Sequence, residues 1–230
     1  MIRWMDIAGR KQLSILDRIE KERYLKMTEK KELAYFQIGS SFGGNQRWMT
    51  DPWMHIGGCA ALTSCDALIC LALQKNRPEL YPYDLVHMTK KDYKKFAMSM
   101  KLYLRPRNSG IKDLDTYIEG FRNYLEDVEV TDIQMRGLSG HEDPAEAKAA
   151  ICAQIDAGIP VPYLMLKHQD KQFDFFDWHW FLIIGYEQRG DACYIKAATY
   201  GEPHWLPLER LWDTGQEEKG GIVLLEMNAA

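Results

Sequence analysis

Cys59 has the residue type and the local setting that nucleophilic catalysis by a thiol requires. It follows Gly57-Gly58 and opens the apolar run of residues 60–74, whose composition predicts a helix buried on every face. Amides at a helix N-terminus stabilise an anion, so a thiol in this position is expected to lose its proton more easily. The two glycines let a substrate approach the sulfur closely. We therefore predict that Cys59 is a nucleophile.

His179 is the candidate proton partner of this thiol. It stands at the entrance of the apolar run of residues 178–186, which is predicted to be a strand. Rigid backbone at the end of a sheet holds an imidazole in place, as general-base catalysis requires. A thiol and a histidine brought together in this way form a pair suited to acyl transfer.

The elements that must position this pair are helices first and strands second. Helices are predicted at residues 11–35, 60–74, 84–103, 112–127 and 144–156, and strands at residues 159–166, 178–186, 192–198 and 221–227. This order predicts one α+β domain over residues 1–230. It comprises an N-terminal helical extension (1–35), a mainly helical half with the nucleophile (36–127) and a mainly β half with the histidine (128–230).

The composition of the chain limits the classes of molecule that it is expected to bind. Hydrophobic residues make up 46% of the chain, and 29 basic against 33 acidic side chains give a formal net charge of -4, which provides no bulk attraction to nucleic acid or anionic lipid. The N-terminus lacks the apolar core of a secretory signal, and no run is long and uncharged enough to span a membrane. We expect a cytoplasmic protein with no nucleic-acid and no membrane partner; the sequence carries no signal for an oligomeric state.

The cysteines do not indicate a disulfide framework or a zinc site. Their number is odd and their spacing irregular, without a CxxC pair: Cys59, Cys65, Cys70, Cys152 and Cys193. We interpret Cys65 and Cys70 as core residues of the nucleophile helix. His168, Asp170 and Asp174 crowd the region before His179, but they straddle a turn without helical HxxxH spacing. We therefore expect neither a metal nor another cofactor.

Two longer segments contain the candidate pair. The first is GGCAALTSCDALICLAL from Gly57; the second is HWFLIIGYE from His179, a turn at Gly190-Asp191, and YIKAATYG ending at Gly201. Over roughly residues 36–211 they resemble the nucleophile helix, histidine strand and third-residue strand of bacterial papain-like proteins similar to the C39-like, bacteriocin-processing peptidases. The resemblance implies a papain-like fold in which a residue on the strand after the histidine orients the imidazole.

This chain departs from that family at two positions. Where the family places Asp or Asn, it has Thr199, whose hydroxyl can accept an imidazole N–H but carries no charge. Asp177, two residues before His179, is the alternative orienting residue. The family also has a glutamine a few residues before the cysteine, whereas here Gln46 lies thirteen residues before it. Gln46 is expected to share an oxyanion hole with the Cys59 amide, and Asn45 is the substitute candidate.

The resemblance and the pair together predict a cysteine hydrolase, with a peptide or small amide as substrate and peptidase activity as the leading expectation. The same apparatus serves deamidases and acyltransferases. Aromatic residues are interpreted mainly as core, with some flooring a substrate pocket: Trp48, Trp53, Trp178, Trp180 and Tyr200. Two other classes stay open, a papain-like binding protein without turnover and a metal-dependent enzyme around His168 and Asp174.

Overall fold

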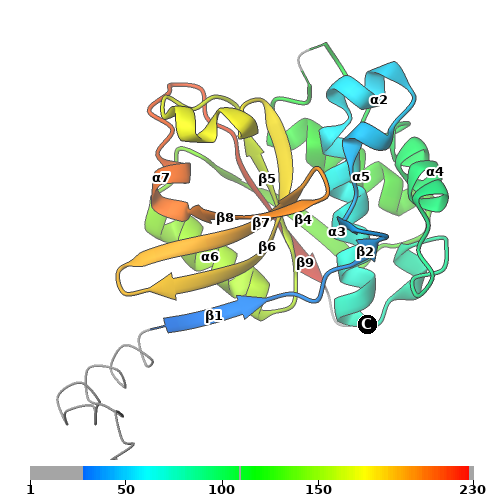
Figure 1. Cartoon of the computed structure of the whole chain (residues 1–230), viewed down its shortest axis with the longest axis horizontal. Coiled ribbons are helices and arrows are strands. Elements are labelled where there is room, and N and C mark those ends of the chain that lie inside the picture. Colours follow the sequence, from blue (N-terminus) through cyan, green and yellow to red (C-terminus); the bar gives the residue numbers. More distant parts are fainter. Residues whose placement is uncertain (1–27, 109, 228–230) are drawn as a thin grey trace, which may run out of the picture.

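Helices dominate the first half and antiparallel strands the second half of the part that the computed structural model describes, residues 28–108 and 110–227. The α-helices of this part are α2 (Pro52–Gly57), α3 (Cys59–Lys75), α4 (Lys90–Met100), α5 (Leu114–Asp127), α6 (Pro144–Asp156) and α7 (Leu208–Trp212). Short 3-10 helices lie at η1 (Gln46–Trp48), η2 (Pro78–Leu80) and η3 (Lys171–Phe176). Figure 1 shows α2 to α5 grouped on one side, beside a sheet that carries α6 and α7. The predicted α+β class is confirmed.

The strands of the second half form one antiparallel sheet, which a strand from the first half joins. Its strands are β1 (Thr28–Glu32), β4 (Ile133–Ser139), β5 (Val161–Met165), β6 (His179–Arg189), β7 (Ala192–Thr199), β8 (Glu202–Pro207) and β9 (Gly221–Met227). The strand order is β4-β9-β5-β6-β7-β8, and a small hairpin of β2 (Gln37–Ile38) and β3 (Ser41–Phe42) lies apart from it. The strands predicted from the sequence match β5, β6, β7 and β9.

The first part of β6 is the centre of the sheet. His179 to Ile183 pair with β5, while the later part, Gly185 to Arg189, pairs with β1. Every residue from His179 to Tyr186 is buried, as its apolar sequence predicts. The helix α3 packs against this strand and against β5. The two elements that carry the candidate pair are therefore neighbours in the core.

The beginning of α3 depends on a tight junction with α2. Asp51 caps α2 by accepting the Met54 amide at 3.0 Å, and Pro52 occupies the first turn. Gly58 then links α2 to α3, and a Cβ there would lie 2.4 Å from the Met54 carbonyl oxygen. No side chain caps the first turn of α3. The amides at this helix end, beginning with that of Cys59, are thus left to face the site.

The prediction of a helix as far as Tyr35 is wrong for the residues that the structure describes. Thr28 to Glu32 form strand β1 and residues 33–35 have no regular secondary structure, while residues 1–27 lie outside the described residues. β1 fills the edge of β6 that β5 leaves open beyond Ile183. Backbone pairing with an open edge does not need an apolar pattern in the added strand. The charged sequence TEKKE is also typical of an exposed helix surface, and this is the reason for the wrong helix prediction.

Within the described ranges, every helix is too short or too polar to cross a bilayer.

A buried carboxylate ties α3 to the loop that precedes it. Asp66, in the middle of α3, accepts hydrogen bonds from the hydroxyl of Tyr93 at 2.6 Å, the hydroxyl of Tyr35 at 2.7 Å and the amide of Gly44 at 3.2 Å. Burial raises the pKa of Asp66 to about 6, although these hydrogen bonds act in the opposite direction. The segment that leads to Gln46 is thus fastened to the nucleophile helix.

Replacing Asp66 tests this fastening through its pH dependence. The folded protein holds the Asp66 proton more tightly than the unfolded chain, so between the ordinary pKa of 3.8 and about 6 the free energy of unfolding falls as pH rises. In Asp66→Asn this contribution, on the order of 3 kcal/mol, is absent. Denaturant unfolding from pH 3.5 to 7 measures the difference between the two proteins. A difference that stays constant over this range would contradict the assignment.

Candidate active site

The structure places Cys59 and His179 around the same space. Cys59 is the first residue of α3 and His179 the first residue of β6. Both line a small cavity of about 20 Å³ and a wider cleft of about 450 Å³, and Tyr200 also lines both spaces. Their side chains are nearly sealed, at 6% and 5% exposure. A substrate group that enters the cleft meets both residues at its floor.

The His179 ring is held by two contacts. Its Nε2 lies 2.7 Å from the Thr199 hydroxyl oxygen. The ring also stacks on Tyr200, with the ring centres 4.8 Å apart and the planes within 6°. Within the described part of the chain, Nδ1 of His179 makes no hydrogen bond. Nδ1 is therefore the ring nitrogen without a hydrogen-bond partner in this part of the chain.

The Thr199 hydroxyl oxygen is placed so that it can accept a proton donated by Nε2 of this imidazole. When Nε2 carries the proton and donates it to Thr199, the lone pair is on Nδ1. This is the form in which His179 can act as a base toward the thiol. Thr199, at the end of β7, occupies the place beside His179 that the sequence analysis proposed for it.

Burial keeps the resting pair neutral. It raises the pKa of the Cys59 thiol, and the backbone N–H groups of Trp180, Ala60 and Cys59 itself only partly oppose this effect. Burial also lowers the pKa of His179 to about 3. The prediction that the helix N-terminus makes Cys59 unusually acidic is therefore wrong for the resting protein, because desolvation of the sulfur outweighs the favourable amides.

Gln46 lies against the same small cavity as Cys59. Its side chain is buried, and its Nε2 donates to the His55 carbonyl at 3.0 Å. The second hydrogen on Nε2 remains available, and Oε1 has no partner among the described residues. With the backbone amide of Cys59, Gln46 supplies the kind of donors that an oxyanion hole needs.

Asn45, the substitute for Gln46, is committed elsewhere. Its Oδ1 accepts the Arg47 amide at 2.9 Å, and its Nδ2 donates to the Tyr200 carbonyl at 2.6 Å. It lines neither of the two spaces at Cys59. Asn45 instead fixes the backbone of the residue that stacks on His179.

Asp177 does not hydrogen-bond to the His179 ring. It ends η3 before β6 begins, and its carboxylate accepts the His168 amide at 3.0 Å. Its side chain lines the wider cleft. Of the two candidates for orienting the imidazole, only Thr199 contacts it.

The residues proposed as an alternative metal site make local structural bonds. His168 Nδ1 accepts the Asp170 amide at 2.9 Å, and its Nε2 lies 2.9 Å from the Arg210 carbonyl oxygen. Asp170 pairs with the Arg210 guanidinium at 2.5 Å. Among residues 28–108 and 110–227, no three His, Cys, Asp or Glu side chains are grouped so that they could hold a metal ion.

The remaining cysteines stay outside the site. Cys65 and Cys70 are buried within α3, as predicted, and burial raises the pKa of each. All five thiols are unpaired. Cys59 is the cysteine that meets the open cleft.

Several residues that shape the cleft were not assigned to it from the sequence. Arg107, Lys112 and Phe175 line it together with Trp178 and Tyr200, two members of the aromatic cluster of which some were expected to floor a substrate pocket. Tyr200 has a positive φ of 50°, which is uncommon for a bulky residue and directs its ring over His179. Its position next to Gly201, after a strand, was the available signal for a special turn.

Comparisons with known proteins add no relationship. No family model matches the sequence, and a search of curated proteins finds no match.

Substituting Thr199 tests its hold on the imidazole. In Thr199→Val the Nε2–H loses its acceptor in a buried site, so we expect a mixture of His179 tautomers and a loss of about 1–3 kcal/mol in the free energy of unfolding. Thr199→Ser, which keeps the hydroxyl, should retain the single Nε2–H form. Nitrogen-15 NMR of the histidines at pH 7 distinguishes these cases. A wild-type ring protonated on Nδ1 would contradict the base role.

Proposed function

We propose that this protein is a papain-like cysteine hydrolase that cleaves amide bonds through a thioester on Cys59, with a peptide as its substrate. The observation that carries the proposal is that Cys59 and a His179 ring fixed by Thr199 line one cavity at the floor of an open cleft. The resemblance of the two motif segments to papain-like peptidases supports the same conclusion. Five unpaired thiols fit a reducing compartment, so we place the protein in the cytoplasm.

Proton transfer accompanies the attack in this mechanism, because the resting pair is neutral. The Cys59 sulfur bonds to the amide carbon while its proton passes to Nδ1 of His179. The imidazolium and the carbonyl oxyanion arise together, and their attraction offsets part of the desolvation that opposes either charge alone. The mechanism therefore does not require an ion pair in the free protein.

The carbonyl oxygen becomes an anion as the tetrahedral intermediate forms. The Cys59 amide and the free N–H of Gln46 are the donors we assign to it. The C–N bond then breaks, and His179 returns the proton to the leaving amine. Water adds to the thioester with His179 as base, releases the carboxylic acid and restores the thiol. A different amine in place of water gives transfer instead of hydrolysis.

A binding protein of the same fold is the second candidate, and the charge state of the site favours it. The raised pKa of Cys59 and the lowered pKa of His179 are typical of two buried side chains that stay uncharged and unreactive. In that case the cleft holds a peptide without turning it over.

Acylation by p-nitrophenyl acetate separates the two candidates. A working pair should release nitrophenolate in a burst of about one equivalent per chain, and mass spectrometry should find the acetyl group on Cys59. His179→Gln should slow the burst by about 10²-fold or more, since proton transfer in the transition state is lost. Cys65→Ser, a core cysteine of the same helix, is the matched control and should retain the burst.

A protein that gives no burst, or one whose acetyl group is found on another cysteine, would contradict the hydrolase proposal and leave the binding protein.

A further inference from the structure

Exposed apolar side chains are concentrated around the Cys59 cleft. Of the nine large hydrophobic side chains exposed in the described residues, six line the cleft or the groove beside it: Trp53, Ile56, Met98, Leu102, Phe175 and Trp178. The groove has a volume of about 610 Å³ and shares Arg107 and Asn108 with the cleft. A patch of this kind marks a binding surface, and the shared residues make groove and cleft continuous.

The charge of this surface is opposite to that of the whole chain. Arg107 and Lys112 line the cleft, and Arg105 joins Arg107 in the groove. No ion pair involves any of these three cations within residues 28–108 and 110–227, whereas the groove's Lys101 is paired with Asp51 at 2.6 Å. The formal net charge of the protein is -4, so the excess of positive charge here is local.

Two details fix the positive charge at the cleft. The Lys112 ammonium lies 4.9 Å from the centre of the Trp178 ring, which holds the charge over the opening. The one acidic side chain among the described residues that line the cleft is Asp177, and its carboxylate is already engaged by the His168 amide. Arg107 and Lys112 outnumber this carboxylate, so the charged side chains that line the cleft are net positive.

We infer that the cleft and groove select a peptide segment that carries a carboxylate side chain beside apolar residues. The carboxylate binds at Arg107 and Lys112. An apolar side chain of the peptide lies in the groove lined by Trp53 and Leu102. The inference names the substrate class of the proposed hydrolase and rests on that function for the cleavage step. The recognition itself depends only on the surface. Its test can therefore be separated from the test of catalysis.

The rates at which two alkylating reagents of nearly equal size label Cys59 report the charge around this thiol. Iodoacetate and iodoacetamide transfer similar groups to a thiol, but only iodoacetate is an anion. Relative to glutathione, Cys59 should prefer iodoacetate, and Arg107→Gln with Lys112→Gln should lower the iodoacetate-to-iodoacetamide rate ratio by at least about threefold. The iodoacetamide rate alone should not change. About 0.5 M salt should also reduce the preference.

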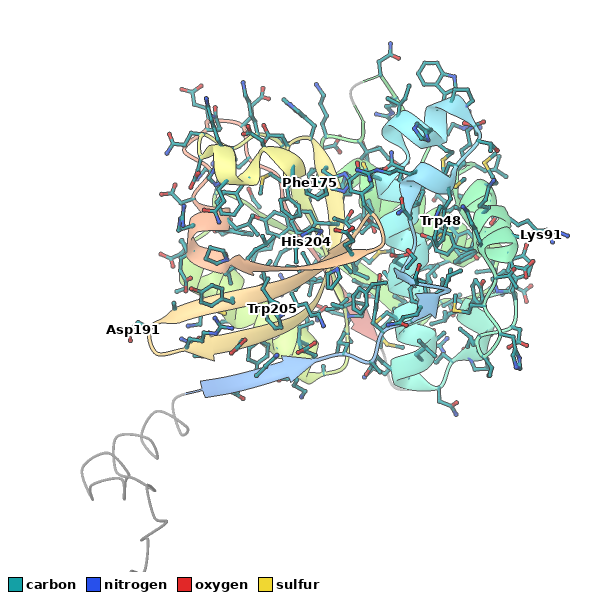
Figure 2. All side chains as sticks on the ribbon, viewed as in Figure 1. Trp48, Lys91, Phe175, Asp191, His204 and Trp205 are labelled. Carbon is teal, nitrogen blue, oxygen red and sulfur yellow. The ribbon has the colours of Figure 1, made fainter. Side chains whose placement is uncertain are left out.

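Lys91→Gln is the matched control, since it removes one exposed lysine elsewhere. Lys91 lies at the outer edge of the helical group, far from Phe175 at the cleft (Figure 2). This variant should keep the wild-type ratio. A ratio equal to that of glutathione, or one that the double variant leaves unaltered, would overturn the inference.

Peptide protection extends the test to the apolar groove. Acetyl-Leu-Glu-Leu-Gly-amide should slow iodoacetamide labelling of Cys59 at a concentration several-fold lower than the matching Leu-Gln-Leu peptide. Leu102→Ser should weaken protection by both peptides. Equal protection by the acidic and neutral peptides would count against the inference.

The outcomes distinguish this inference from the proposed function. A wild-type preference for iodoacetate without an ester burst keeps the acidic-peptide surface and rejects the hydrolase. A burst from Cys59 without that preference keeps the hydrolase and rejects the substrate class.

Discussion

The His179 ring is held by the hydrogen bond between its Nε2 and the Thr199 hydroxyl and by its flat contact with Tyr200. These contacts fix the orientation of the ring. They also make the site depend on the sheet, because Thr199 ends β7, and Asn45 holds the Tyr200 backbone from the other half of the fold. A small movement of β7 relative to β6 would release the ring and remove the base.

Burial holds the two side chains in place but also opposes the charges that catalysis needs. The packing that fixes Cys59 and His179 also keeps both neutral, so the free protein lacks the thiolate that a helix N-terminus can stabilise. In our account, reactivity arises only when substrate allows both charges to form together. The cations at the rim, Arg107 and Lys112, act earlier, by attracting the ligand. Thus recognition and proton transfer are carried by different parts of the cleft.

The sequence was informative where local composition decides structure. The mainly apolar helix α3 and the buried strand β6 followed from their composition, and with them the positions of Cys59 and His179. Thr199 was placed by a family resemblance, and the structure puts its hydroxyl at the imidazole.

Features that depend on tertiary contacts were not accessible in the same way. β1 is a charged segment that pairs through its backbone, and β8 contains two prolines at the edge of the sheet, so neither shows a strand pattern. The neutral state of the pair follows from burial, which only the packed molecule specifies. Arg107 lies in the connection between α4 and α5, and only the folded chain brings it to the cleft that Cys59 lines.

The most direct measurement of the central claim is a crystal structure of the protein after reaction with a peptide aldehyde. We predict a tetrahedral carbon bonded to the Cys59 sulfur, with its oxygen within hydrogen-bonding distance of the Cys59 amide and Gln46 Nε2, and with His179 still bound to Thr199. An unmodified Cys59, or an adduct whose oxygen points into the cleft away from Gln46, would contradict the account.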